Sequence, residues 1–381
     1  MRLLHTSDWH IGRTFHGQDL LADQEFVLSA LADLVREHRV EAVVIAGDIY
    51  DRAVPSAESV QVATRVFRHL REAGAVLIAS SGNHDSAPRL GAFSDFLAVG
   101  GLHLRTSVAA VADPVMLSDD AGPVAVYAVP YLEPEVVKTA LRVPGRPGHQ
   151  AVMTAAMDRV RADLATRPPG TRSVVAAHAF VVGGVAGGSE RSIAVGGVES
   201  VTSDVFGGID YVALGHLHGG QSVTDRIRYC GSPLPYSFGE AGQCKGAWLI
   251  DLDEAGGITD RWLPLPVVRP LAVLEGTLAD LLIGFPDHSD HYLALILTDP
   301  VRPLEPMRRL RERYSHALTV SWEPSARSGS PPIFSRPAAL STDAQVLAEF
   351  LADCRGSTAS AGEQRLLHEA LAHDRRLEVS R

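Results

Sequence analysis

Short apolar segments that stop abruptly at polar side chains recur through the first 220 residues. The clearest one is Val43-Val44-Ile45-Ala46, which runs directly into Gly47-Asp48. Fully apolar runs of this length are typical of parallel strands that are buried on both faces. Four other segments have the same form, namely residues 3–6, 76–78, 174–177 and 211–214. The pattern therefore predicts an α/β domain whose strands deliver polar groups to the edge where ligands collect.

Helical spacing of apolar residues fills the stretches between these strands. It predicts helices over Leu20–His38, over a segment that opens at Ser56 and stops at Gly74, over residues 88–100, and over Ala151–Leu164. Residues 123–130 are expected to form a further strand. Short runs between residues 228 and 251 indicate antiparallel strands that close the sheet.

Three prolines, Pro264, Pro266 and Pro270, mark the end of this α/β region, because successive prolines cannot continue a central strand. Beyond them, residues 292–297 predict a strand, and a helix rich in arginine carries Leu304, Met307, Leu310, Tyr314 and Leu318 on one face. The resulting division of the chain is an α/β domain at 1–265, a small α+β domain at 266–324, a linker at 325–342 rich in Ser, Pro and Gly, and two amphipathic helices at 343–381.

Composition and charge indicate the class of protein and its cellular compartment. The chain has 381 residues, 46% of them hydrophobic and 21% charged, as in ordinary globular proteins. Its start meets Asp8 before the apolar core of a signal peptide could form, and no later run is long enough to span a bilayer, so we expect a cytoplasmic protein without a membrane partner. Three cysteines at unrelated spacings predict neither a disulfide framework nor a zinc site. The net charge of −10 argues against binding nucleic acid by bulk electrostatics, but not against a local grip through metal ions or a basic patch.

Metal-type side chains follow all five strands. The candidate ligands are Asp8, His10, Asp48, Asn83, His178, His216 and His218. A carboxylate such as Asp48 can offer one oxygen to each of two cations, which holds paired metals roughly 3.5 to 4 Å apart. Mixed nitrogen and oxygen ligation suits manganese, iron or zinc better than magnesium or calcium.

Each of these side chains alone is a weak signal, because an isolated His or Asp at a strand end is usually a hydrogen-bonded structural residue. The order of the motifs is the stronger observation. Asp-x-His, Gly-Asp-x-x-Asp-Arg, Gly-Asn-His-Asp, a single His and Gly-His-x-His follow one another, each after an expected strand. The combination predicts a dinuclear metal site.

This order resembles that of the calcineurin-like metallophosphoesterases and, within them, of the bacterial SbcD-type nuclease subunits that act in DNA double-strand-break repair. The segments that carry the resemblance are 5–13 (HTSDWHIGR), 47–55 (GDIYDRAVP), 81–86 (SGNHDS) and 231–238 (GSPLPYSF). The likeness is strongest to about residue 250 and implies a four-layer α/β/β/α sandwich.

The resemblance also implies which residue does what. One cation would be held by Asp8, His10, Asp48 and His218, and the second by Asp48, Asn83, His178 and His216, with Mn²⁺ as the expected ion. A water between the cations would attack the phosphorus in line.

Three further residues remain near these motifs. His84 is left over from coordination and is our candidate to protonate or stabilise the leaving oxygen. Asp51 either orients His84 through a hydrogen bond or pairs with Arg52 or caps the following helix, and the sequence leaves these readings even. Asp85 is expected to fix its loop by bonding backbone amides.

The implied function is an SbcD-like subunit of an SbcC–SbcD complex, a metal-dependent nuclease with double-strand exonuclease and single-strand or hairpin endonuclease activity in repair, recombination and replication. A homodimer joined through the helices near residues 56–74 and 88–100 would work with an SbcC-type ATPase, because this chain has no Walker A sequence. The last two helices are the candidate for docking that ATPase, and the arginines of 302–313 either contact DNA or form a solvated face.

Two alternatives stay open. The same metals could serve a metallophosphatase or phosphodiesterase acting on a small phosphoester, a cyclic nucleotide or a phosphoprotein, although Ala53 and Asp85 depart from the protein phosphatase pattern. The chain could instead be a non-enzymatic scaffold, but such a protein would be expected to have lost some of its metal ligands. The glycine-rich segment 183–197 lacks the Lys-Ser/Thr of a phosphate cradle and predicts a loop beside the site, with Arg191 in it.

Overall fold

A computed structural model gives the structure of this chain. It describes residues 1–188, 190, 200–324, 342–355 and 358–378. The expected linker at 325–342 falls almost entirely outside the described residues, as do Arg191 and most of the glycine-rich segment.

The first of two six-stranded sheets has the order β16-β15-β1-β4-β5-β6. Its parallel strands are β1 (Arg2–Thr6), β4 (Ala42–Ala46), β5 (Val76–Ser80) and β6 (Leu102–Arg105). At the other end lie β15 (Gly246–Leu252), antiparallel to β1, and β16 (Ile258–Pro264), antiparallel to β15. The apolar runs at residues 3–6, 43–46 and 76–78 form the parallel strands β1, β4 and β5, as expected.

The second sheet has the order β13-β14-β12-β9-β8-β7. The parallel strands are β8 (Gly122–Val129), β9 (Arg172–His178), β12 (Tyr211–Gly215) and β14 (Ile227–Tyr229), and the antiparallel ones are β7 (Val115–Asp119) and β13 (Gln221–Ser222). The prediction that residues 228–251 are all antiparallel closing strands is wrong for β14, which pairs parallel with β12. The segment that joins β12 to β14 runs back along the sheet, so the two strands point the same way. This segment contains β13, which pairs antiparallel with β14.

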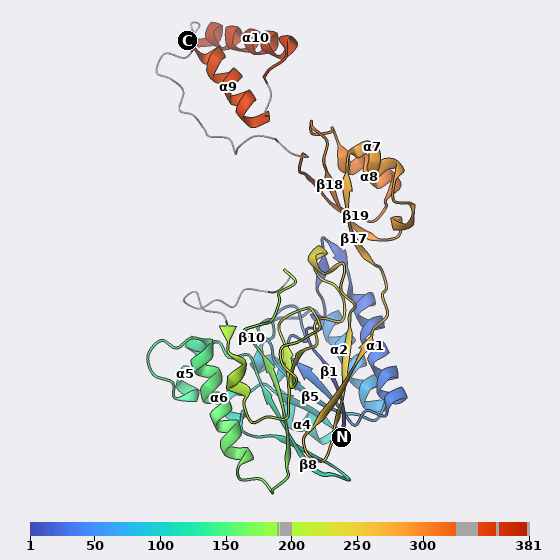
Figure 1. Ribbon diagram of the computed structural model, residues 1–381, viewed down its shortest axis with the longest axis vertical. Coiled ribbons are helices and arrows are strands. Elements are labelled where there is room, and N and C mark those ends of the chain that lie inside the picture. The colour runs from blue at the N-terminus through green and yellow to red at the C-terminus, as the bar shows by residue number, and fades with distance from the viewer. Residues whose placement is uncertain (189, 191–199, 325–341, 356–357, 379–381) are drawn as a thin grey trace. The chain divides into compact units, whose positions relative to one another are not determined.

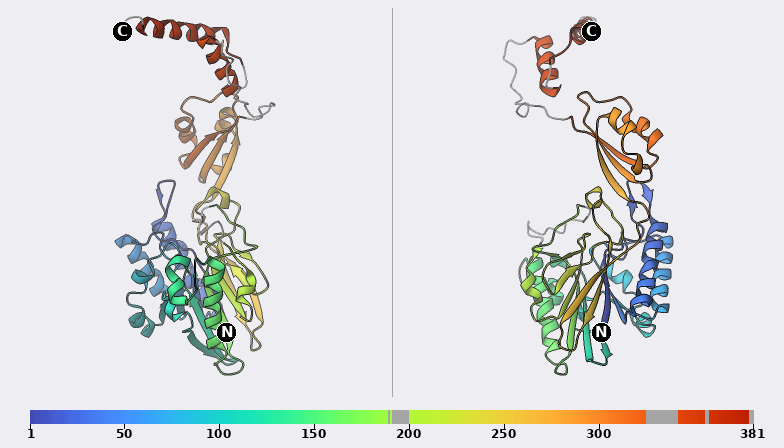
Figure 2. Two further views of the ribbon diagram at one scale, coloured as in Figure 1. Left: turned by 90° about the vertical axis from the view of Figure 1, so that its left-hand side faces the viewer. Right: turned by 45° about the vertical axis from the view of Figure 1, so that its right-hand side comes forward.

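Two helices cover each sheet, and the two sheets pack face to face (Figures 1 and 2). Helices α1 (Leu21–His38) and α2 (Ala57–Glu72) lie on the first sheet, and α5 (Pro134–Leu141) and α6 (His149–Leu164) on the second. Alternate residues of a strand face opposite ways, so Val43 and Ile45 pack under the helices while Val44 and Ala46 face the other sheet. The four-layer α/β/β/α sandwich is confirmed.

The sequence located most helices of this domain, did not predict α5, and missed one break. Helix α1 agrees with expectation, and the Ser56 side chain caps α2 by accepting a hydrogen bond from the Ser59 amide at 3.2 Å. The single helix expected over 88–100 is instead α3 (Ala87–Leu90) and α4 (Ser94–Val99). The chain turns at Gly91, the C-cap of α3, where the absence of a side chain leaves room for Thr106: a Cβ there would lie 2.2 Å from Thr106 Oγ1.

The C-terminal part contains a three-stranded sheet in the order β17 (Leu271–Gly276), β18 (Tyr292–Leu297), β19 (Ala317–Trp322), with helices α7 (Leu278–Ile283) and α8 (Pro306–Arg313). Strand β18 matches its expected bounds. The expected helix through Leu318 is too long, because α8 ends at Arg313 and Leu318 lies in β19. The last helices are α9 (Asp343–Arg355) and α10 (Ala361–Glu378), as the amphipathic pattern predicted.

Short elements complete the fold. They are the two-residue strands β2 (Thr14–Phe15), β3 (Gln18–Asp19), β10 (Phe180–Val181) and β11 (Ser200–Val201), and the 3-10 turns Val108–Ala110, Ser203–Phe206, Phe238–Glu240 and Pro286–His288.

Contacts divide the chain into two compact units. The first comprises Met1–Leu274, Phe285–Ala294 and Arg311–Thr319, and the second comprises Glu275–Gly284, Leu295–Leu310 and Val320–Arg381. Cys230 and Cys244 are free thiols. Within the part of the chain that the structure describes, no helix has the length and apolar content needed to cross a bilayer.

Candidate metal centre

The carboxyl ends of strands from both sheets meet at one buried site. Asp8 and His10 follow β1, Asp48 follows β4, Asn83 follows β5, His178 ends β9, and His216 and His218 follow β12. All of these side chains except Asn83 are buried, although six are ionisable. Burying ionisable groups costs free energy unless they are paired or coordinate a metal. The cluster therefore indicates a site that binds metal ions.

The backbone at this site is held in an unusual conformation. Asp8, His10 and Asp48 have φ values of 52°, 45° and 50°, and His216 has 103°. Left-handed conformations of non-glycine residues cost of order 1–3 kcal/mol each and cluster at functional sites. Four of the seven candidate ligands therefore sit on strained backbone.

Two glycines let the loops approach one another. A Cβ on Gly47, whose φ is 83°, would lie 2.5 Å from His178 Nδ1, and a Cβ on Gly82 would lie 2.1 Å from Asp48 Oδ1. Only glycine gives the ligands of the two sheets this spacing.

One group of ligands forms around His10 and His218. Their Nε2 atoms face each other at 3.1 Å, and Asp8 completes a set whose ligand atoms lie within 4.8 Å of one another. Asp8 is fixed by the Ser7 hydroxyl at 2.5 Å and by the His216 amide at 2.9 Å. Two imidazole nitrogens directed at one point beside a carboxylate match the donor set of a transition metal.

A second group forms around His178. Its Nδ1 donates to the Ala46 carbonyl at 3.0 Å, which leaves Nε2 directed at Asn83 Oδ1, 2.9 Å away, and at Asp48 Oδ2, 3.3 Å away. A histidine whose other nitrogen is held by a backbone carbonyl is the usual arrangement for a metal ligand. The His216 ring packs edge-on against the His178 ring, with centroids 5.4 Å apart.

Asp48 stands between these groups. Its Oδ2 lies 3.6 Å from His10 Nε2 and 3.3 Å from His178 Nε2, so one carboxylate faces the ligands of both sets. Its Oδ1 accepts a hydrogen bond from the His84 amide at 2.8 Å. This position is the one that a carboxylate shared by two cations requires.

His84 lies at the rim of the site and is less buried than the ligand histidines. Its Nδ1 donates to the main-chain carbonyl of Asp51 at 2.8 Å, and its ring lies edge-on to His10 with centroids 4.6 Å apart. The Asp51 carboxylate is farther away, with Oδ1 at 3.9 Å from His84 Nδ1, 3.6 Å from His10 Nδ1 and 3.7 Å from Arg13. Asp51 therefore contacts His84 through its backbone, and its carboxylate lies among four cationic or titratable groups. The fourth is Arg52, whose Nε is 3.8 Å from Oδ2, so the alternative pairing with Arg52 has a contact as well.

Asp85 does what the sequence led us to expect. Its carboxylate accepts hydrogen bonds from the amides of Ile49, Tyr50 and Gly82 at 2.9 to 3.1 Å and so ties the β4 and β5 loops together. Burial, reinforced by the nearby charge of Asp48, raises the pKa of Asp85 to about 7.

The surroundings shift the pKa values of His178 and His216 in opposite directions. Burial alone would lower the pKa of His178, yet the charges of Asp48 and Asp8 raise it to about 9. Burial lowers the pKa of His216 to about 3, with a smaller contribution from the charge of His178. Because a cation must displace the His178 proton, its binding here weakens as the pH falls.

Sequence reasoning missed the residues that support the ligands from behind. Gln24 Nε2 donates to the carbonyl of His10 at 2.7 Å and to the Tyr236 hydroxyl at 2.9 Å, and that hydroxyl donates to the Trp9 carbonyl at 2.6 Å. Glu190 accepts from the His218 amide at 3.0 Å. Tyr236 lay within a quoted motif, but nothing in a single sequence assigns a partner to Gln24 or Glu190.

Comparison with known proteins agrees with this geometry. The model of the calcineurin-like phosphoesterase family matches residues 1–220, more than half of the chain, so the chain belongs to that family and is a metal-dependent phosphoesterase. The clustered Asp and His groups fit two divalent metals.

A second match concerns the other end of the chain. Residues 267–353 match the type 5 capsule protein repressor C-terminal domain, the C-terminal domain of SbcD-type proteins. The chain therefore combines the two domains that the sequence motifs implied for an SbcD-type nuclease subunit.

Two solved structures resemble the chain at low identity. A Thermus thermophilus protein is 14% identical, with a TM-score of 0.39, over 68% of this chain and 98% of its own. A dimetal phosphatase from Danio rerio is 12% identical, with a TM-score of 0.39, over 69% of this chain and 96% of its own.

Proposed function

We propose that this chain is the nuclease subunit of an SbcC–SbcD-type complex and that it hydrolyses phosphodiester bonds of DNA at a dinuclear centre. The observation that carries the proposal is the position of Asp48 Oδ2 between His10 and His178, which belong to different sheets. A single-cation site would not need a carboxylate that faces both groups.

The ligands divide into two sets that share Asp48. Asp8, His10 and His218 with Asp48 would hold one cation, and Asn83, His178 and His216 with Asp48 the other, with manganese as the ion we expect. A pair of such cations supplies a water of lowered pKa and offsets charge on the phosphoryl oxygens. The chain's own part is to fix these ligands, which the strained loops and their cross-links do before substrate arrives.

His84 is the group that we assign to the leaving oxygen. With Nδ1–H committed to the Asp51 carbonyl, its Nε2 is left for a substrate oxygen, and its ring lies between the buried ligands and solvent. An imidazolium there can donate the proton that the departing alkoxide needs. We assign Asp51 to orienting His84: its main-chain carbonyl holds Nδ1, and its carboxylate Oδ1 lies 3.9 Å from the same nitrogen.

DNA is the substrate that the two-domain combination supports. The C-terminal match is to a domain of SbcD-type proteins. The chain has no Walker A motif, so ATP would be used by the partner.

The test is manganese-dependent digestion of a labelled hairpin duplex by the purified chain, alone and with an SbcC-type ATPase. We expect the wild type to cleave and His84→Ala to bind two manganese ions without cleaving. Loss of bound metal from His84→Ala would show that His84 has been misassigned. Absence of hairpin cleavage, together with rapid hydrolysis of a small phosphodiester, would favour the alternative small-substrate enzyme.

We assign the ATPase contact to the C-terminal helices. Helices α9 and α10 carry apolar side chains such as Phe350 and Leu366 that are more than half exposed. Such faces favour docking on a partner. Deleting residues 343–381 should leave basal nuclease activity intact and prevent co-purification with the ATPase, whereas an intact complex would contradict this role.

The homodimer contact is assigned to a groove along α2, α3 and α4, whose cavity has a volume of about 730 Å³. Phe93 and Phe96 in its wall are 68% and 81% exposed. Exposed apolar surface of this kind marks protein contacts. Phe96→Glu should convert a dimer to a monomer in sedimentation analysis, and a wild type that sediments as a monomer would contradict the assignment.

A further inference from the structure

A buried ion pair lies directly behind one of the candidate metal ligands. Glu240, in the 3-10 turn Phe238–Glu240, has a side chain that is 0% exposed, and Lys245, just before β15, is 6% exposed. Neither residue carries a role in the catalytic scheme above. Fully buried charges are rare unless they are paired and serve a purpose.

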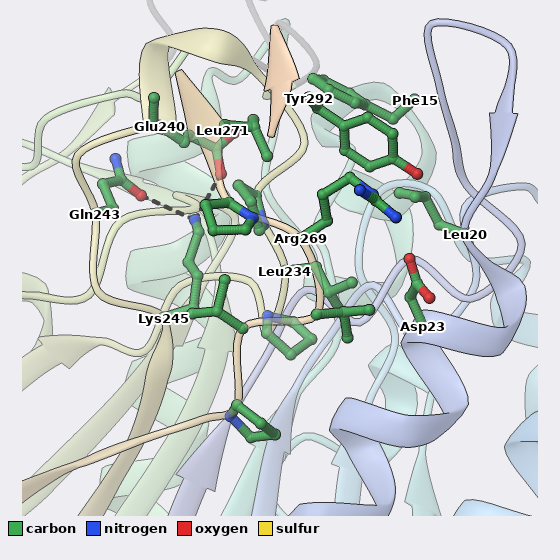
Figure 3. A pocket seen from close by; sticks show the side chains of 17 residues that line it. Phe15, Leu20, Asp23, Leu234, Glu240, Gln243, Lys245, Arg269, Leu271 and Tyr292 are labelled. Atoms are coloured by element: carbon green, nitrogen blue, oxygen red, sulfur yellow. Dashed lines mark hydrogen bonds and ion pairs between the residues drawn. The ribbon is translucent and has the colours of Figure 1, made fainter. Parts of the chain in front are cut away.

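The lysine is saturated with acceptors. The three N–H groups of its ammonium have four acceptors within hydrogen-bond distance: Glu240 Oε2 at 2.5 Å, the His218 carbonyl at 2.7 Å, Gln243 Oε1 at 2.8 Å and the Ser232 hydroxyl at 3.1 Å. Figure 3 shows this ammonium between Glu240 and Gln243, at the edge of a cavity of about 260 Å³. Lys245 thus holds the backbone of His218 and the carboxylate of Glu240 in one fixed arrangement.

Glu240 in turn faces the ring of His218. Its Oε2 takes the Lys245 ammonium and the Tyr236 amide, the latter at 3.3 Å, while its Oε1 lies 3.6 Å from His218 Nδ1. On the opposite side of the same ring, Nε2 faces His10 Nε2. The imidazole therefore has a carboxylate behind one nitrogen and the metal position in front of the other.

We propose that Glu240, clamped by Lys245, is a positioning residue that fixes the ring of His218 for the cation shared with Asp8 and His10. A carboxylate behind a metal-binding imidazole sets which nitrogen carries the proton, orients the ring and raises the basicity of the ligand. The inference rests on the dinuclear centre proposed above and adds residues that none of its motifs assigns.

The experiment measures manganese binding to the purified full chain by calorimetry and by elemental analysis, without substrate. Loss of a carboxylate behind a metal ligand typically lowers metal affinity 10- to 100-fold. We expect Glu240→Gln to weaken one of two manganese sites by about that factor and to leave the other unchanged. Wild-type affinity at both sites in Glu240→Gln would overturn the proposal.

A matched control separates positioning from folding. Asp119→Asn removes the carboxylate of another ion pair, which partly buried Asp119 makes with buried Arg172 far along the sheet from the centre. It should lower thermal stability and leave both manganese affinities unchanged. If Asp119→Asn weakens manganese binding as much as Glu240→Gln does, the effect is general destabilisation and the proposal fails.

A double variant decides the matter if Glu240→Gln folds poorly. Glu240→Gln combined with Lys245→Met removes both charges of the buried pair. Removing both partners destabilises a fold less than removing one, because no unpaired charge is left buried. We expect the double variant to regain stability while one manganese site stays at least 10-fold weaker. Recovery of both stability and affinity would overturn the positioning role. A wild type that binds fewer than two manganese ions would instead contradict the dinuclear centre itself.

Discussion

Gly82→Ala adds one methyl group at the point where the β5 loop crosses Asp48. That methyl would lie 2.1 Å from Asp48 Oδ1, 2.5 Å from Asp48 N and 2.6 Å from Asp48 Cγ. Non-bonded heavy atoms settle at roughly 3.5 to 4.0 Å. To reach the lower limit the Asp48 oxygen or the Gly82 backbone must move by about 1.4 Å.

That displacement is large on the scale of metal coordination. Ligand distances at a metal site are held to about 0.2 Å, so the shift is about seven times the tolerance, and Asp48 is the residue that we propose as the ligand common to both cations. A misplacement of about 1 Å can lower the rate of an enzyme by about 10²-fold. Crowding a packed site typically costs about 1–3 kcal/mol of unfolding free energy.

The assays are manganese content after gel filtration and the rate of hairpin cleavage. We expect Gly82→Ala to retain fewer than two ions per chain and to be at least about 100-fold slower than the wild type. Gly242→Ala is the control, because a Cβ there meets nothing within 4 Å and the residue is not in a left-handed conformation. Two bound ions and a normal rate in Gly82→Ala would refute the assignment of Asp48 as the shared ligand.

Further predictions concern stability. Arg172 holds the pKa of Asp119 well below its usual value of 3.8, so the pair stabilises the fold above that pH and is lost as the pH falls through the lower folded value. Asp119→Asn should therefore cost about 3–5 kcal/mol at pH 7 and flatten the acid limb of the unfolding free energy below pH 4, as denaturant titrations would show. Removing metal with a chelator should lower the melting temperature of the wild type, because cations bind the folded chain; an unchanged melting temperature would contradict the dinuclear centre. Tyr236→Phe leaves the Trp9 carbonyl and the Gln24 amide without the hydroxyl and should cost about 1–3 kcal/mol in thermal unfolding, with a smaller loss contradicting the network.

The sequence was informative where chemistry follows directly from a local pattern. Apolar runs that end in Asp, His or Asn identified the central strands and placed their polar ends together, and the structure brings all seven candidate ligands to one site. The cap of α2 at Ser56 was equally local. These features depend on residues within a few positions of one another.

Long-range contacts limited the rest. Gln24 meets Tyr236, 212 residues away, and no local pattern records that meeting. The turn at Gly91 packs against Thr106, 15 positions further on, and β14 runs parallel to β12 because the residues between them cross back. In each case the deciding partner lies on another segment.

The loops of the centre are held mainly by one another. The Asp8 amide donates to the Gly47 carbonyl at 3.1 Å, and the His10 amide donates to the Asp48 carbonyl at 3.0 Å. The amides of His216 and His84 in turn bind the side chains of Asp8 and Asp48. These bonds offset the strained left-handed backbone of the ligands only while all the loops are in place, because each loop supplies the acceptor for another. The sharing of acceptors explains how ligands from two sheets are preorganised, and it implies that replacing Asp8 or Asp48 disturbs both cation positions and not only the nearer one.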